Sequence, residues 1–155
     1  MAIHLVRHAK AGSRSDWAQP DELRPLTAGG ALQATAIADL LRDRPVKRIL
    51  SSPLVRCVQT VQPLADALGL EVEQHPALSE EADPEDTWAL IRELNGTEAV
   101  LCSHGNIVPE VVDRAVRAGA EIVGQETGNK KGSIWMLEIG EDGSVSSVRY
   151  TPPPA

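Results

Sequence analysis

Aromatic residues are scarce in this chain of 155 residues, which has no phenylalanine, one tyrosine and three tryptophans. Leucine, valine, isoleucine and many alanines must therefore form the core, and the small alanine side chains let helices pack closely. Hydrophobic residues make up 42% of the chain, and no linker-like stretch divides it. This length and composition fit one compact domain with a sizeable core. We expect that domain to span residues 1–150 and a proline-rich tail to span residues 151–155.

Cysteine is scarce too, since Cys57 and Cys102 are the only two. Neither has a second cysteine or a histidine at the spacing of a metal site. Both lie inside segments with the pattern of regular structure, so we interpret them as small buried residues. The sequence therefore predicts no metal site.

Long hydrophobic runs and an excess of positive charge are absent as well. The formal net charge is −7, and a protein needs a basic face to neutralise the phosphates of nucleic acids or anionic membranes. We therefore expect neither nucleic acid nor a membrane as a partner. No run approaches the roughly 20 apolar residues of a membrane span. The apolar start over residues 1–6 lacks the basic leader and cleavage site of a signal peptide, which favours a cytoplasmic location.

Apolar runs typical of buried strands alternate with helical patterns along most of the chain. The strand patterns cover residues 3–6, 48–51, 70–73 and 98–102, and the helical patterns begin near residues 27, 53, 84 and 107. This alternation predicts an α/β fold, a three-layer α/β/α sandwich with a mostly parallel central sheet. Two further extended runs, over residues 132–139 and 145–150, flank Asp142-Gly143 and predict a C-terminal edge hairpin.

Three features of the helical patterns make specific predictions. Thr27 has the side chain of a helix N-cap, and Gly69 is the residue type that ends a helix in the left-handed conformation. Pro63 lies inside the second helical pattern and predicts a kink or a break there. In the first helical pattern, one stripe of residues is expected to face the core. That stripe comprises Leu32, Ala36, Ile37, Leu40 and Leu41.

Basic and hydroxyl residues directly follow three of the expected strands. Arg7-His8 follows the first strand, Ser51-Ser52 the second and Ser103-His104 the fourth. In open sheets of this kind, ligands bind beyond the carboxyl ends of the strands. We therefore expect these residues, together with Arg56, to form one site.

Two arginines and two histidines in one site suit the chemistry of a phosphoryl group. Arg7 and Arg56 can each offer a planar pair of donors to two phosphoryl oxygens. One neutral histidine can attack phosphorus and form a phosphohistidine that water later hydrolyses, while the other donates hydrogen bonds. The departing alkoxide needs a proton. Glu80 is the preferred donor of that proton, and Glu81 is the second candidate.

With these residues in place, the chain resembles the histidine phosphatase superfamily, which includes the cofactor-dependent phosphoglycerate mutases, over nearly its full length. Five segments carry the resemblance in the family's order: Leu5-Val6-Arg7-His8-Ala9, Arg24-Pro25-Leu26-Thr27-Ala28-Gly29-Gly30, Ser51-Ser52-Pro53-Leu54-Val55-Arg56-Cys57-Val58-Gln59-Thr60, Leu78-Ser79-Glu80 and Ser103-His104-Gly105-Asn106. Ala9 stands where the family usually has glycine. The run from Arg7 to Arg14 is most similar to short bacterial members, which include SixA-type phosphohistidine phosphatases and phosphatase domains fused behind a Nudix hydrolase domain.

The resemblance implies a role for each residue of the expected site. It implies that His8 is the phosphorylated nucleophile, that Arg7, Arg56 and His104 form the phosphate pocket, and that Glu80 donates the proton. It implies neither a metal nor another cofactor. A second group of residues is expected to contact the substrate, namely Lys10, Arg14, Arg24, Ser51, Gly105 and Asn106.

Three functions are compatible with this sequence. The first is hydrolysis of a phosphomonoester or phosphohistidine, with a phosphorylated small molecule, a nucleotide or a phosphohistidine protein as the partner. The second is a phosphoglycerate-type mutase, which is disfavoured because the short chain lacks the insertions that enclose a bisphosphate. The third is a non-catalytic module that binds a phospholigand, although such a module would be free to lose His8 or Glu80. The oligomeric state stays open.

Overall fold

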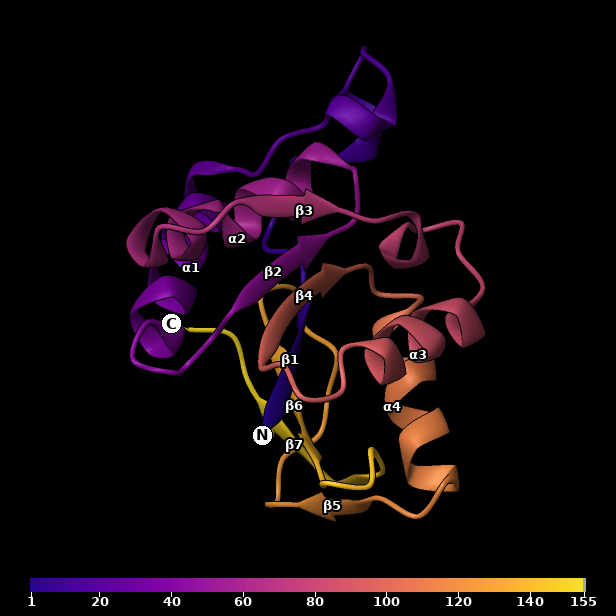
Figure 1. The fold of residues 1–155 in the computed structure, drawn as a ribbon. Helices are drawn as coiled ribbons and strands as arrows, with labels where there is room; N and C mark the ends of the chain where they lie inside the picture. The colour runs from indigo at the N-terminus through magenta and orange to yellow at the C-terminus, as the bar shows by residue number, and fades with distance from the viewer. Residues whose placement is uncertain (155) are drawn as a thin grey trace.

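A seven-stranded sheet forms the centre of the computed structural model, which describes residues 1–154 (Figure 1). Its strands are β1 (Ala2–Arg7), β2 (Arg48–Ser51), β3 (Val72–Gln74), β4 (Ala99–Ser103), β5 (Glu121–Val123), β6 (Ile134–Ile139) and β7 (Val145–Thr151). Their spatial order is β3-β2-β4-β1-β6-β7-β5. Parallel pairing joins β3, β2, β4 and β1, whereas β1 pairs with β6 and β6 with β7 in antiparallel fashion. The predicted mostly parallel sheet is confirmed.

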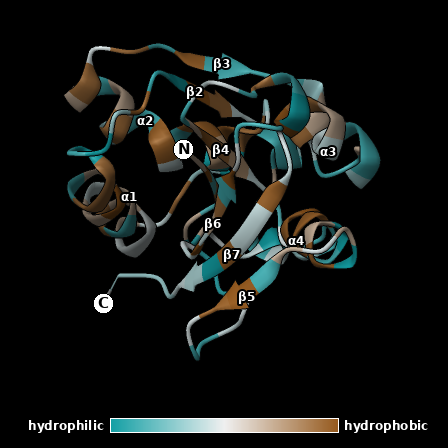
Figure 2. Ribbon diagram, turned by 60° about the horizontal axis from the view of Figure 1, so that its bottom comes forward, coloured by the Kyte–Doolittle hydropathy of each residue, from teal (hydrophilic) through white to brown (hydrophobic). Residues whose placement is uncertain are grey.

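Helices cover both faces of this sheet. The α-helices are α1 (Ala28–Leu41), α2 (Val55–Leu68), α3 (Pro84–Glu93) and α4 (Val108–Arg117). The α1–α2 pair lies on one side of the sheet and the α3–α4 pair on the other (Figure 1). Figure 2 shows the same layers after a turn of 60°, with hydrophobic segments on the strands between the two pairs. The three-layer α/β/α prediction is therefore confirmed.

Each face of the sheet has its own hydrophobic core. On one face, Ile37 of α1 and Val61 of α2 belong to the same buried cluster as Val6 of β1. On the other face, Leu5 of β1 belongs to a cluster that includes Val111 of α4. Successive side chains of a strand point to opposite faces, so β1 is packed on both sides. The residues that follow β1 therefore start from a fixed position in the middle of the sheet.

The prediction of which α1 residues face the core is partly wrong. Leu32 and Leu40 are exposed, with relative accessibilities of 73% and 51%. The buried residues of α1 are Gly30, Gln33, Ala34, Ile37, Ala38 and Leu41. A Cβ atom on Gly30 would lie 1.9 Å from the carbonyl oxygen of Lys10, so backbone approaches backbone at this point. This close approach places Gly30 on the inner face of α1, and Leu32 and Leu40 then lie on the sides of the helix that face solvent.

The predicted helix ends are confirmed, but the predicted break at Pro63 is wrong. The Thr27 side chain accepts a hydrogen bond from the Gly30 N–H at the start of α1. Gly69 ends α2 in the left-handed conformation, with φ of 67°. Helix α2 runs through Pro63 without interruption. Leu64 and other buried α2 residues hold this helix against the sheet, and that packing offsets the one backbone hydrogen bond that proline removes.

The C-terminal hairpin is also confirmed, since β6 and β7 pair across a turn that contains Gly143 with φ of 83°. An unpredicted strand, β5, pairs in parallel with β7 and takes the edge position, so the hairpin lies one strand in from the edge. Strand β7 includes Thr151, the first residue of the expected tail, while Ala155 lies outside the described residues. Within residues 1–154, no helix has both the length and the hydropathy needed to cross a membrane.

Candidate active site

Three adjacent parallel strands end at the same edge of the sheet and bring the expected site residues together. Strand β4 lies between β2 and β1, and its Ser103 is paired with Arg7. The His8 N–H donates to the Ser103 carbonyl at 3.0 Å, and the Ser52 N–H donates to the Cys102 carbonyl at 2.9 Å. The chain therefore leaves all three strands at one level, as the sequence predicts.

A cavity of about 370 Å³ opens at this edge. Its lining consists of Arg7, His8, Ala11, Gly12, Ser13, Arg14, Arg24, Arg56, Glu80, His104, Gly105, Asn106 and Lys131. Five of these residues are arginine or lysine, and only Glu80 is acidic. In a chain whose overall charge is negative, this local excess of positive charge favours an anionic ligand.

His8 is buried beside this cavity with one ring nitrogen fixed. Its Nδ1 lies 2.8 Å from the Ala9 carbonyl oxygen. A carbonyl can only accept a hydrogen bond, so Nδ1 carries the proton and Nε2 keeps its lone pair. The rings of His8 and His104 lie edge to face, with centroids 5.5 Å apart. His8 is therefore held as the tautomer in which Nε2 can act as a nucleophile.

Burial lowers the pKa of the His8 imidazole to about 3. The hydrogen bond to Ala9 opposes this shift, while the charges of His104, Arg56 and Arg7 add to it. A neutral imidazole is the nucleophilic form. The surroundings of His8 therefore keep it in that form from neutral pH well into the acidic range.

The lowered pKa predicts that His8 makes the fold less stable in acid. As pH falls below about 6.5, the unfolded chain protonates this imidazole, whereas the folded protein does not until about pH 3. The contribution of His8 to folding therefore becomes less favourable over this window. In urea titrations at pH 7 and pH 4.5, we expect His8→Gln to lose about 2 kcal/mol less free energy of unfolding than the wild type. Equal losses in both proteins would contradict the burial of a neutral His8.

Arg7 is fixed by the loop that precedes β6 and by Gly105. Its Nη1 donates to the carbonyl oxygen of Asn129. The Asn129 side chain in turn donates from Nδ2 to the Gly105 carbonyl at 2.9 Å. A Cβ atom on Gly105 would lie 2.6 Å from Cζ of Arg7, so the guanidinium group rests directly on the glycine backbone. Glycine at position 105 therefore sets where the arginine lies.

Arg56 extends from the first turn of α2 and is only 1% exposed. Its Nη2 donates to Glu80 Oε2 at 2.9 Å and to Asp21 Oδ2 at 3.1 Å, and its Nη1 donates to the Asp21 carbonyl at 3.0 Å. Asp21 also accepts from Arg24 Nε at 2.9 Å. Burial raises the pKa of Asp21, but the arginines outweigh this effect, so the pKa of Asp21 is lowered. Asp21 is thus an ionised anchor for the arginines around the cavity.

His104 is buried and held from behind by Ser52. Its Nε2 lies 2.8 Å from Ser52 Oγ and 3.5 Å from Cys57 Sγ. Its Nδ1 lies 3.9 Å from Glu80 Oε2, on the side that faces the cavity. With Nε2 occupied by Ser52, Nδ1 is the atom available to a ligand.

Arg14, Arg24, Gly105 and Asn106, four of the expected substrate contacts, also line the cavity. The other two do not. Lys10 is exposed and lies outside the lining, and Ser51 is buried with its hydroxyl donating to the Ser52 carbonyl.

Glu81, the second candidate for proton donor, lies outside the cavity lining, whereas Glu80 is part of it. Asn106 Nδ2 donates to the Glu80 carbonyl at 2.8 Å and ties the two loops together. Within residues 1–154, no three His, Cys, Asp or Glu side chains gather as a metal site would require.

Several residues at the site have no signal in the sequence. Asp21 binds Arg56, and Asn129 holds Arg7. Lys131, which comes shortly before β6, also lines the cavity. None of these three residues lies in a recognisable sequence pattern. Ser52, by contrast, is expected in the site because it follows β2, and it contacts His104.

Comparison with known proteins identifies the family of this chain. Residues 3–130 match the sequence profile of the histidine phosphatase superfamily (branch 1). The 8-oxo-(d)GTP phosphatase of Mycolicibacterium smegmatis is 34% identical over 98% of this chain and 48% of its own length. A protein of Yersinia enterocolitica named as a probable phosphoglycerate mutase, GpmB, is 32% identical over 78% of this chain and 62% of its own length. The chain thus spans about half to three-fifths of these relatives.

Solved structures of SixA proteins have the same fold. The protein histidine phosphatase SixA complexed with tungstate is 25% identical, with a TM-score of 0.72 over 100% of this chain and 97% of its own. The SixA protein of Agrobacterium tumefaciens is 25% identical, with a TM-score of 0.73 over 99% of this chain and 97% of its own. The profile match covers most of the chain, including β1, α2 and β4. The chain belongs to the histidine phosphatase superfamily.

Proposed function

We propose that this protein is a phosphatase that hydrolyses a phosphomonoester or phosphohistidine through a covalent phosphohistidine on His8. The observation that carries this proposal is the state of the His8 ring. Its Nδ1 is hydrogen-bonded to the Ala9 carbonyl oxygen. The lone pair of Nε2 is therefore free, and the ring lies beside a cavity lined by Arg7 and Arg56. Membership of the histidine phosphatase superfamily supports the same reaction.

In the proposed reaction, the arginines and His104 bind the phosphoryl group. Within residues 1–154, the buried Nε atoms of Arg7 and Arg56 have no hydrogen-bond partner. A buried donor without a partner is costly, so these atoms favour a ligand rich in acceptor oxygens. Donors already in place stabilise the charge that develops on the phosphoryl oxygens during transfer. The tungstate bound to the SixA relative is likewise a tetrahedral oxyanion.

Nε2 of His8 then attacks phosphorus, and the bond from phosphorus to the leaving oxygen breaks. We assign to Glu80 the proton that this oxygen needs, because its carboxylate lines the cavity and lies 3.9 Å from His104. In the second step, Glu80 takes a proton from the water that attacks the phosphohistidine. Inorganic phosphate leaves, and His8 returns to its starting form.

We propose as substrates a phosphorylated small molecule, a nucleotide or a phosphohistidine protein. The names of the relatives support more than one of these classes, since one is an 8-oxo-(d)GTP phosphatase and another a protein histidine phosphatase. The lining residues Arg14, Arg24 and Lys131 supply positive charge beyond the proposed phosphate pocket. They favour substrates that are themselves strongly anionic.

The direct test is release of inorganic phosphate from an activated aryl phosphate by the purified chain in the presence of a metal chelator. We expect turnover under these conditions, because every proposed role belongs to a side chain. Absence of turnover by well-folded protein would favour a module that only binds phospholigands. Activity that disappears with the chelator would contradict the mechanism.

The proton-donor role of Glu80 predicts an effect that depends on the leaving group. Glu80→Gln is expected to slow hydrolysis of an alkyl phosphate by about 100-fold or more, because its alkoxide cannot leave without a proton. An activated aryl phosphate needs little protonation, so its loss should be about threefold or less. The matched control is Glu81→Gln, the neighbouring carboxylate outside the cavity lining. Equal losses on both esters would remove Glu80 from the acid role.

A further inference from the structure

The carboxylate of Glu80 is bound by two arginines at once. Its Oε2 accepts from Arg56 Nη2 at 2.9 Å, and its Oε1 accepts from Arg14 Nη2 at 3.2 Å. A carboxyl group that donates a proton must turn one oxygen toward the leaving oxygen, but both oxygens of Glu80 are held by arginines. A proton donor must hold its proton when the leaving group departs. These two ion pairs therefore oppose the role that we propose for Glu80.

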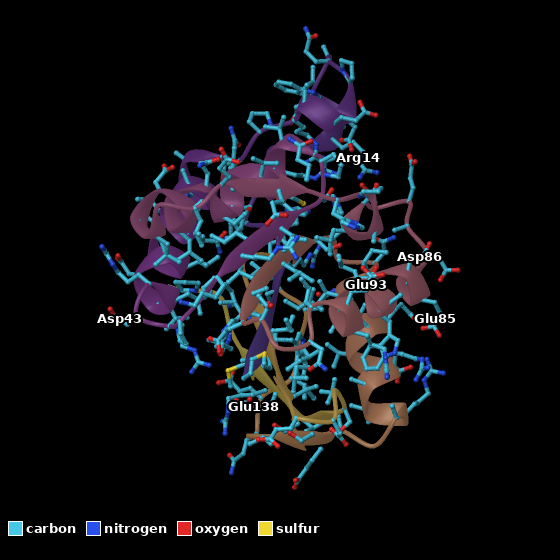
Figure 3. All side chains as sticks on the ribbon, in the orientation of Figure 1. Arg14, Asp43, Glu85, Asp86, Glu93 and Glu138 are labelled. Atoms are coloured by element: carbon cyan, nitrogen blue, oxygen red, sulfur yellow. The ribbon has the colours of Figure 1, made fainter. Side chains whose placement is uncertain are left out.

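A bound phosphoryl group breaks only one of these two ion pairs, the one between Arg56 and Glu80. Arg56 belongs to the proposed phosphate pocket, so phosphoryl oxygens compete with Glu80 for its Nη2. Arg14 comes instead from the loop between β1 and α1 that projects at the top of Figure 1, and its side chain is 66% exposed. Figure 3 labels Arg14 beside this loop. A single phosphoryl group bound by Arg7 and Arg56 leaves the Arg14–Glu80 pair in place.

The position of Arg14 indicates which part of the substrate can break the second ion pair, between Arg14 and Glu80. Arg14 lines the cavity and contacts the oxygen of Glu80 that Arg56 does not use. Because Glu80 must reach the leaving oxygen, Arg14 lies near the group that carries this oxygen. An anion on the leaving group can therefore take Arg14 from Glu80. Lys131, which also lines the cavity, adds a second positive charge for such an anion.

We infer that the substrates are phosphate esters whose leaving group carries a second anionic group, a phosphate or a carboxylate, and that its binding to Arg14 frees the Glu80 carboxyl group to reach the leaving oxygen. This inference rests on the proposed phosphatase function. Once freed, Glu80 takes a proton from solvent and passes it to the leaving oxygen as His8 bonds to phosphorus. Arg14 is thus a specificity-determining residue that couples recognition of the leaving group to proton donation.

The test compares propyl phosphate with 3-phosphonooxypropanoate, which differs by a terminal carboxylate. We expect kcat/KM of the wild type to be at least about tenfold higher for the carboxylated ester. In Arg14→Gln this preference should disappear. The kcat of the variant should fall for the carboxylated ester and rise for propyl phosphate. A residue that only binds substrate, or only supports the loop, would not raise kcat for propyl phosphate, whose leaving group is uncharged. Arg14→Lys should keep the preference.

Arg48→Gln is the matched control, because it removes another exposed arginine that is ion-paired with a carboxylate, Glu73, outside the cavity. It should behave as the wild type. A preference that survives in Arg14→Gln, or equal losses on both esters, would overturn the inference. If the wild type hydrolyses an activated aryl phosphate but shows no preference between the alkyl esters, only the role of Arg14 fails. If it hydrolyses none of the three, the proposed function fails.

Discussion

Replacing His8 with alanine is expected to lower phosphomonoester turnover by about 10⁴-fold or more and to abolish covalent labelling of the protein. The substitution removes Nε2, the atom that we propose to bond with phosphorus, and no second nucleophile takes its place in the mechanism. The measurement is a brief incubation with a substrate carrying labelled phosphate, followed by denaturation. A phosphohistidine is lost in acid and survives in base, so wild-type label should follow that pattern.

The control for this experiment is His75→Ala. His75 lies outside the cavity lining and caps the short helical turn Pro76–Leu78, where its ring accepts from the Ala77 N–H. This variant tests whether loss of any histidine with a structural contact reduces turnover. We expect it to keep both activity and label. Label that persists in His8→Ala would place the nucleophile elsewhere and contradict the proposal.

The part of the fold that the sequence predicts is the part in which local pattern and long-range packing agree. Residues 99–102 are apolar because β4 (Ala99–Ser103) is buried along its whole length. Strand β5 has three residues, of which Glu121 and Ile122 are exposed. It therefore has no apolar pattern, and its place at the sheet edge depends on pairing with β7. Its existence is a tertiary effect that a single sequence does not display.

The residues of the site also divide into those that the local sequence pattern predicts and those that depend on tertiary contacts. Arg7 is the last residue of β1, and His8 and His104 directly follow β1 and β4, so the parallel topology is enough to bring them together. Lys131 reaches the cavity, and Asp21 reaches Arg56, from the irregular connections between the main elements, whose paths depend on contacts made far away in the chain. The Asp21 carboxylate, for example, matters only because Arg56 comes to it from α2, 35 residues later. Residues of this kind require the structure.

Gly105→Ala is expected to lower kcat/KM by about 100-fold while leaving the fold nearly as stable as the wild type. The new Cβ would lie 2.6 Å from Arg7 Cζ and 2.7 Å from its Nε and Nη2. These atoms are the end of a flexible side chain, so the clash is relieved when the guanidinium group moves away. The substitution therefore weakens phosphate binding and leaves the stability of the fold nearly unchanged. Loss of one positioned donor to a developing oxyanion costs about 10²–10³-fold in rate.

The matched control is Gly29→Ala, since a Cβ there meets only Thr27 Oγ1 at 3.8 Å within α1. That variant should retain full activity, with alanine favoured over glycine in the helix by about 0.5–1 kcal/mol. Urea unfolding separates the two possible consequences of Gly105→Ala. A large loss of stability with little loss of kcat/KM would mean that Arg7 stays in place and that the backbone at position 105 shifts instead. A large loss of kcat/KM at nearly constant stability, close to that of Arg7→Ala, would identify Gly105 as the residue that positions Arg7.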